Sequence, residues 1–101
     1  MAHTTSFKFR AKPGERGAVI NHFQLWERQR KPYAKGFLHG MLARDIDDFD
    51  AFLATVVFDT FDNYNANSND PEQTAWYEEL LSHIVSEPEW FNANVEVEMS
   101  A

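Results

Sequence analysis

The stretch Ala51-Phe52-Leu53-Ala54-Thr55-Val56-Val57-Phe58 decides the fold, because it is rich in the β-branched and aromatic residues that favour strands. It is apolar on both faces of the predicted strand, with Phe52, Ala54, Val56 and Phe58 on one and Ala51, Leu53 and Val57 on the other. In a two-layer domain of this size, helices cover only one face of a sheet. We therefore expect a second copy of the chain to cover the other face, which predicts a homodimer through sheet faces.

A second strand is predicted just before this stretch. Gly36 opens the run Phe37-Leu38-His39-Gly40-Met41-Leu42-Ala43-Arg44, which is too short and too evenly apolar for a surface helix. Simple alternation would put His39 on the same strand face as Phe37 and Met41. The cluster Asp45-Ile46-Asp47-Asp48 is typical of a turn, so the two runs predict an antiparallel hairpin.

The N-terminal part predicts a strand followed by a long helix. Residues 3–11 alternate at Phe7, Lys8, Phe9 and Arg10, and Lys12-Pro13-Gly14 ends the strand. From Glu15 the apolar positions change to steps of three and four residues, which predicts an amphipathic helix to about Lys31, where Pro32 disturbs the last turn.

The C-terminal part predicts two helices and a last strand. Asp59 or Thr60 can cap a short helix to about Asn65, and Asn67-Ser68-Asn69 is typical of a loop. Asp70-Pro71-Glu72-Gln73 is a strong helix start, and apolar spacing continues this helix towards Pro88. Alternation over residues 90–98 predicts the last strand.

These elements predict one α+β domain over residues 1–101, ferredoxin-like βαββαβ in order, with a four-stranded antiparallel sheet and helices on one face. No segment is long and apolar enough for a membrane span, and the polar start predicts no signal peptide. The expectation is a soluble cytoplasmic protein. The absence of cysteine excludes disulfides, thiolate metal sites and cysteine nucleophiles.

Charge divides the chain into two parts. All nine Lys and Arg lie within residues 8–44 against two acids, and the remaining fourteen acids follow with no Lys or Arg. The halves could attract one another within one fold or across a dimer, or they could be separate solvated faces. Attraction of an anionic ligand by the basic part is a further alternative.

The ordered features resemble the antibiotic biosynthesis monooxygenase family across nearly the whole chain. They are the Pro13-Gly14 turn, Gly36-Phe37 opening a strand, a strand ending at Phe58, Tyr64 six residues later, and Asp70-Pro71-Glu72 starting the last helix. The resemblance implies a dimeric α+β barrel in which two sheets pack face to face. It also implies a pocket between sheet and helices in each subunit, and chemistry without a metal, flavin or other cofactor.

Side chains that could carry this chemistry are histidines and aromatics at helix and strand positions. A histidine with a pKa near neutrality is a natural base for deprotonating a phenol or a carbon acid. The candidate catalytic residues are His22, His39 and His83. The candidates for binding an aromatic small molecule are Trp26, Phe58, Tyr64, Trp76, Tyr77 and Arg44. Each also has a structural interpretation, since aromatics at these spacings commonly pack in a core.

The hypothesis is a small cofactor-independent monooxygenase-like enzyme acting on an aromatic or quinol-like molecule. The alternatives are a noncatalytic ligand-binding or assembly protein and a cofactor-free cyclase or isomerase of the same fold. Heme breakdown, which also occurs in this superfamily, is disfavoured because the first strand has no asparagine and Tyr77 occupies the position of the expected histidine ligand. No metal site is predicted from the histidine and acid spacing, and Lys35-Gly36-Phe37 matches an RNA-binding signature for only three residues, so no nucleic-acid partner is expected.

Overall fold

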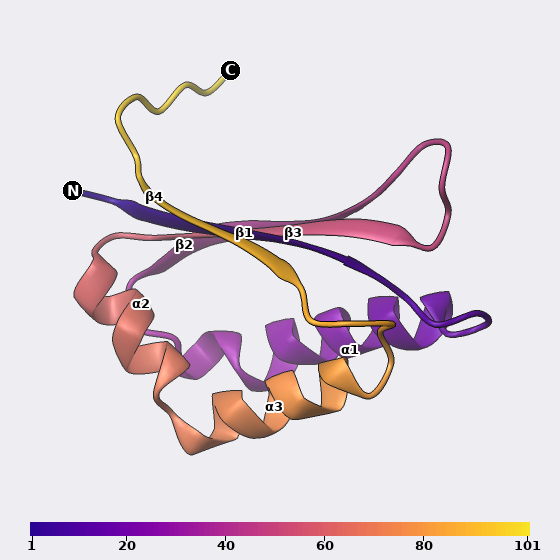
Figure 1. Ribbon diagram of the computed structural model, residues 1–101. Helices are drawn as coiled ribbons and strands as arrows, with labels where there is room; N and C mark the ends of the chain where they lie inside the picture. Colours follow the sequence, from indigo (N-terminus) through magenta and orange to yellow (C-terminus); the bar gives the residue numbers. More distant parts are fainter.

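The computed structural model describes all 101 residues and has a sheet covered on one face by helices (Figure 1). The sheet has four strands in the order β2-β3-β1-β4, and every neighbouring pair is antiparallel. The ferredoxin-like prediction is therefore confirmed. The elements are β1 (His3–Arg10), α1 (Arg16–Gln29), the 3-10 helix η1 (Lys31–Tyr33), β2 (Phe37–Arg44), β3 (Ala51–Phe58), α2 (Phe61–Ser68), α3 (Pro71–Leu81) and β4 (Glu89–Asn94).

The core lies between the sheet and the helices. Residues paired across strands share a face, so Phe7, which pairs with Ala54, and Phe9, which pairs with Phe52, point to the helix side. Val19 of α1 and Leu80 of α3 are fully buried against them. The alternating apolar residues of β1 and β3 thus meet the buried stripes of the two long helices.

A β-bulge in β2 overturns one sequence expectation. Phe37 pairs with Phe58 but His39 pairs with Val57, so Leu38 is an extra residue without a partner. The bulge places Phe37 on the helix side and His39, with Met41, on the opposite side. The prediction that His39 shares a face with Phe37 was wrong.

Both predicted helix starts in the second half are confirmed. Thr60 accepts a hydrogen bond from the backbone N–H of Asn63, and Asp70 accepts one from the N–H of Glu72. However, α2 continues through Asn67 and Ser68, which were predicted as a loop. Asn and Ser side chains favour turns, but adding residues to a helix that has already started is easier than starting one, so α2 includes them.

The ends of α3 and β4 also differ from expectation. α3 stops at Leu81 because Ile84 forms a bridge with Ala11 and the Val85 N–H donates to the Arg10 carbonyl. Ile84, expected in its last turns, extends the edge of the core instead, while Val85 is exposed. β4 ends at Asn94 because its partner β1 begins at His3, which leaves nothing for residues beyond 95 to pair with.

The basic and acidic parts of the chain attract one another within one fold. Arg10 forms a salt bridge with Asp48, Arg16 lies 3.7 Å from Asp50, and Arg30 lies 3.2 Å from Asp70. This confirms the first of the alternatives for the divided charge.

The sheet face opposite the helices has no covering layer in a single chain (Figure 1). Leu53, Met41 and Phe91 lie on this face and are 36%, 64% and 68% exposed. None of the helices is both long and apolar enough to cross a membrane.

Candidate functional site

A cleft of about 1190 Å³ lies between the helix side of the sheet and the helices. Its walls come from β1 and β3 beneath, from α1 and α3 above, and from the edge strand β2 at its side. Most of its lining is apolar, and its volume is slightly above the range of about 300–1000 Å³ that is typical of small-molecule sites. The interior is therefore not closed by side chains.

All six predicted ligand-binding residues line this cleft: Trp26, Arg44, Phe58, Tyr64, Trp76 and Tyr77. They come from α1, the end of β2, the end of β3, α2 and α3, so the fold gathers side chains that are far apart in sequence. Their shared location is an observation of geometry. Their role in binding a ligand stays a prediction.

Hydrogen bonds and ring contacts fix the aromatic walls. The Trp26 indole N–H donates to Gln73 Oε1 over 2.7 Å, and the Trp26 ring lies 5.1 Å from that of Phe37. Burial raises the pKa of Tyr77, whose ring lies 5.7 Å from that of Trp90. The neutral form of this phenol packs against an aromatic guest better than the ionised form would.

Arg44 is the cationic member of the lining that forms no salt bridge within the chain. Its guanidinium carbon lies 4.9 Å from the centre of the exposed Phe49 ring, which holds it by a cation–π contact. Because β2 is an edge strand, Arg44 lies where the cleft opens to solvent.

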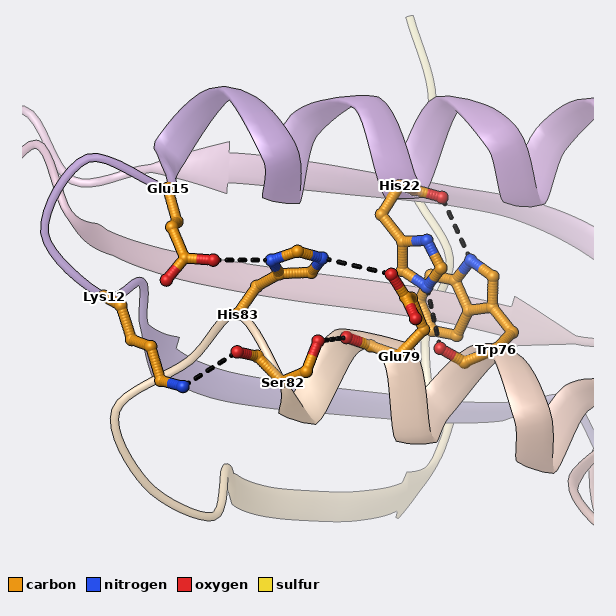
Figure 2. A network of polar contacts seen from close by, with 7 residues as sticks. All are labelled: Lys12, Glu15, His22, Trp76, Glu79, Ser82 and His83. Carbon is orange, nitrogen blue, oxygen red and sulfur yellow. Dashed lines mark hydrogen bonds and ion pairs between the residues drawn. The ribbon is translucent and has the colours of Figure 1, made fainter.

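His22 lies outside the cleft, in the junction between α1 and α3 (Figure 2). Its Nε2 is 2.7 Å from the Trp76 carbonyl oxygen, and the Trp76 indole N–H donates to the His22 carbonyl over 3.0 Å. The two rings are stacked at 4.6 Å. His22 therefore connects two helices, and Trp76 has one side in this junction and another in the cleft.

His83 also lies outside the cleft, just beyond the end of α3 (Figure 2). Its Nδ1 is 2.7 Å from Glu15 Oε1, and its Nε2 is 3.4 Å from Glu79 Oε1. The hydrogen bond with Glu15 raises the pKa of His83, and burial opposes this only in part. The pair joins the start of α1 to the end of α3.

His39 is the predicted catalytic residue that borders the cleft. It lies on the edge strand β2, and its register with Val57 directs its side chain to the sheet face away from the helices. The three histidines are thus not brought together, and one of them is near the cleft.

Sequence reasoning missed a polar chain at the β1–β4 side of the cleft. His3 and Thr5 are 3% and 1% exposed, and His3 Nε2 lies 2.7 Å from Thr5 Oγ1. The Thr5 hydroxyl donates to Asn92 Oδ1 over 2.7 Å, and the His3 ring lies 4.6 Å from that of Tyr64. The alternation His3, Thr5, Phe7 carried a signal for His3, since it places the histidine on the apolar face of β1.

No group of three or more His, Asp or Glu side chains is placed to hold a metal ion. No protein-family model matches the chain, and no curated protein matches it in sequence.

Solved structures do match. A Chloroflexus aurantiacus protein assigned to the antibiotic biosynthesis monooxygenases aligns with a TM-score of 0.80 and 26% identity, over 100% of this chain and 98% of that one. This match supports the predicted resemblance of the chain to the antibiotic biosynthesis monooxygenase family. A monooxygenase of this group from Caulobacter crescentus aligns with a TM-score of 0.84 and 12% identity over 96% of this chain and 91% of its own.

The mutant N63A of SnoaB, a cofactor-independent oxygenase from Streptomyces nogalater, aligns with a TM-score of 0.77 and 16% identity, over 99% of this chain and 98% of that one. At this identity the likeness is one of fold. The resemblance inferred from the turn, strand and helix-start residues is thus supported by the three-dimensional comparison, and the chain has a monooxygenase-like fold.

Proposed function

We propose that the chain is a cofactor-independent monooxygenase-like enzyme that oxidises an aromatic or quinol-like small molecule in the cleft. The observation that carries the proposal is the open cleft of about 1190 Å³ with tryptophan, tyrosine and phenylalanine walls. An interior filled by side chains would instead have favoured a purely structural role. The fold shared with the cofactor-independent oxygenase SnoaB supports the choice of reaction.

The proposed reaction starts with loss of a proton from a phenol or an activated CH₂ group of the substrate. The resulting electron-rich anion passes electrons to O₂, and a CH₂ carbon becomes a carbonyl. One oxygen atom enters the product, and the other leaves as water with the two hydrogens of the CH₂ group. The protein contributes an apolar environment, orientation of the substrate and acceptance of the proton.

We infer roles for the predicted residues from their positions around the cleft. Trp26, Trp76 and Phe58 would stack against the rings of the substrate. Tyr64, Tyr77 and Arg44 would supply hydrogen bonds, with Arg44 at the mouth. Among the predicted histidines we propose His39 as the proton acceptor, since it alone borders the cleft. Its side chain lies on the sheet face away from the helices, so this role depends on the proposed dimer. His22 and His83 hold helices together.

The proposal includes a homodimer through the open faces of two sheets. Leu53, Met41 and Phe91 expose apolar surface on the face that no helix covers. A second copy of the chain presents the same surface, and packing two such faces gives the sheet-on-sheet arrangement of a closed α+β barrel.

Oxygen uptake with a panel of dihydroxynaphthalenes tests the function. These molecules are planar and electron-rich, and their keto tautomers contain the CH₂ group that the proposed step oxidises. A reaction without protein measures their spontaneous oxidation in air, which is subtracted. We expect oxygen consumption equal to product formed and one atom of ¹⁸O per product from labelled O₂. Product formed equally without air would identify the isomerase alternative, and binding without conversion would identify the noncatalytic one.

A further inference from the structure

Two carboxamide side chains of the cleft have their oxygen atoms already bonded within the chain. Gln73 Oε1 accepts from the Trp26 indole N–H over 2.7 Å, and Asn67 Oδ1 accepts from a guanidinium nitrogen of Arg30 over 3.3 Å. Indole and guanidinium groups are donors only, so each amide must present its oxygen to them. The NH₂ group of each amide is therefore the end that is left for another partner.

Both NH₂ groups are accessible. Asn67 and Gln73 line the cleft and are partly exposed. Among residues that are not exposed, Arg30 Nε is the side-chain polar atom that is buried without a hydrogen-bond partner. The amide nitrogens of Asn67 and Gln73 form no hydrogen bond within the chain and are not buried in this way. A ligand in the cleft can therefore meet unpartnered N–H donors.

The fold holds the two amides beside one another. On one side, Trp26 and Arg30 are one helical turn apart at the end of α1, since the Arg30 N–H donates to the Trp26 carbonyl. On the other side, in the turn from α2 to α3, the Asp70 N–H donates to the Asn67 carbonyl and the Gln73 N–H donates to the Asp70 carbonyl. The donor pair is thus fixed before any ligand arrives.

Two neighbouring N–H donors suit an oxygen acceptor of the ligand. A ketone oxygen has two lone pairs and no proton, so it can accept from both amides. In the proposed reaction, loss of a proton from a CH₂ group beside a ketone moves negative charge onto the ketone oxygen. Hydrogen bonds to a charged oxygen are stronger than those to a neutral one, and donors fixed in advance stabilise the developing charge.

We propose that Asn67 and Gln73 bind a ketone oxygen of the substrate through their NH₂ groups. Trp26 and Arg30 are positioning residues for this contact, because they orient the amides. This inference rests on the proposed function. It names the feature of the substrate that the cleft recognises, a ketone beside the reactive carbon of an aromatic ring system.

The test compares 1-tetralone with tetralin, which have the same two fused rings and differ in the ketone. Equilibrium dialysis gives a Kd for each probe, since both absorb ultraviolet light. The readout is the ratio of the two Kd values, because the difference in hydrophobicity between the probes is the same for every variant.

Two variants remove one donor each and keep the neighbouring hydrogen bond. Gln73→Glu keeps an oxygen for the Trp26 indole, and Asn67→Asp keeps one for Arg30, but in each the NH₂ group is replaced by oxygen. Each variant should weaken binding of 1-tetralone relative to tetralin by about fivefold, the effect of one net hydrogen bond. Circular dichroism checks that each variant is folded.

A measurement on the wild type needs no substitution. In a ¹⁵N NMR spectrum, the side-chain NH₂ signals of Asn67 and Gln73 should shift more with 1-tetralone than with tetralin. Equal shifts with the two probes would overturn the inference.

Gln24→Glu is the matched control for the added negative charge. Gln24 also lines the cleft, from α1, and no side chain orients its amide. The same change from amide to acid should therefore leave the ratio of the Kd values near that of the wild type. An equal loss in Gln24→Glu would assign the effect to charge and overturn the inference.

Failure of this inference can be distinguished from failure of the proposed function. If the wild type binds both probes and either folded donor variant keeps the wild-type ratio, the donor pair is overturned and an aromatic-binding cleft stands. If the wild type binds neither probe, both are overturned.

Discussion

Replacement of His22 tests whether it is a structural residue between helices or part of a reactive site. Its side chain accounts for two interactions in the α1–α3 junction: the hydrogen bond with the Trp76 carbonyl and the stacked contact with the Trp76 ring. The residue is 9% exposed, so neither interaction is strongly screened by solvent. The bond from the Trp76 indole to the His22 carbonyl uses the backbone and persists in any variant.

The magnitude follows from these contacts. A neutral hydrogen bond contributes about 1 kcal/mol and an aromatic pair about 1 kcal/mol beyond its area. Alanine has a higher helix propensity than histidine, which offsets about 0.5 kcal/mol. His22→Ala should therefore lower the free energy of unfolding by about 1.5 kcal/mol. For a chain of 101 residues this corresponds to a Tm lowered by about 6–12 °C.

Two further variants divide the effect. His22→Gln keeps an N–H donor but loses the ring, and His22→Phe keeps the ring but loses the donor. Each should lower stability by about half as much as alanine does, in urea unfolding at one fixed protein concentration, since dimerisation would make the midpoint concentration-dependent. Ligand binding in the cleft should stay the same.

A His22→Ala protein with wild-type stability would refute this reasoning. So would loss of conversion in a His22→Gln variant that is folded under the assay conditions, because that outcome would return His22 to the reactive site.

Three other predictions concern parts of the chain outside the cleft. The pKa of His83 is raised above its ordinary value of 6.5, first by Glu15, so its protonated form stabilises the fold. That contribution is complete below about pH 6.5 and is lost as pH rises through the higher folded pKa. Glu15→Gln should therefore weaken the dependence of the urea midpoint on pH between pH 6 and 9. Gly36 has φ of +83°, and an added Cβ would collide with Asp59. Gly36→Ala should therefore lower the free energy of unfolding, measured in urea, by at least about 1–2 kcal/mol. Gly17→Ala is the control and should change it less, because a Cβ at Gly17 meets open space. Light scattering should give the wild type twice the 11.7 kDa chain mass and Leu53→Glu the single mass, and a monomeric wild type would remove the proposed dimer.

Local signals were enough for the elements whose ends depend on nearby residues. The bounds of β3 match the predicted stretch Ala51–Phe58, because β-branched and aromatic residues fill it and acids flank it. The cap at Asp70 and the following Pro71 fixed the start of α3 in the same way. Signals of this kind act on residues a few positions away, so their effect does not depend on which other elements pack nearby.

Long-range pairing decided what local patterns could not. The helical spacing continued through Ile84 beyond the true end of α3, and only the bridge between Ile84 and Ala11 shows why the helix stops. Similarly, the last strand was predicted four residues too long because its length is set by where β1 begins. A sequence pattern indicates that a residue is buried but not which element buries it.

The same limit applies to the candidate site. The aromatic ligand-binding candidates do line the cleft. Their apolar side chains point towards the inside of the domain, and sequence spacing is enough to predict that direction. The histidines were harder to place. α1 has one buried stripe against the sheet, through Val19, and another against α3, through His22, and period alone does not separate them.

His39 shows how a single extra residue changes a functional inference. Without the bulge at Leu38, alternation would direct His39 towards the helices together with Phe37, and it would be a base inside the cleft. With the bulge, His39 lies on the edge strand between the cleft mouth and the uncovered sheet face. A second subunit packed on that face would bury the side chain near the cleft and exclude water from it. The proposed proton acceptor therefore depends on the proposed dimer, because in a single chain His39 is a solvated edge residue.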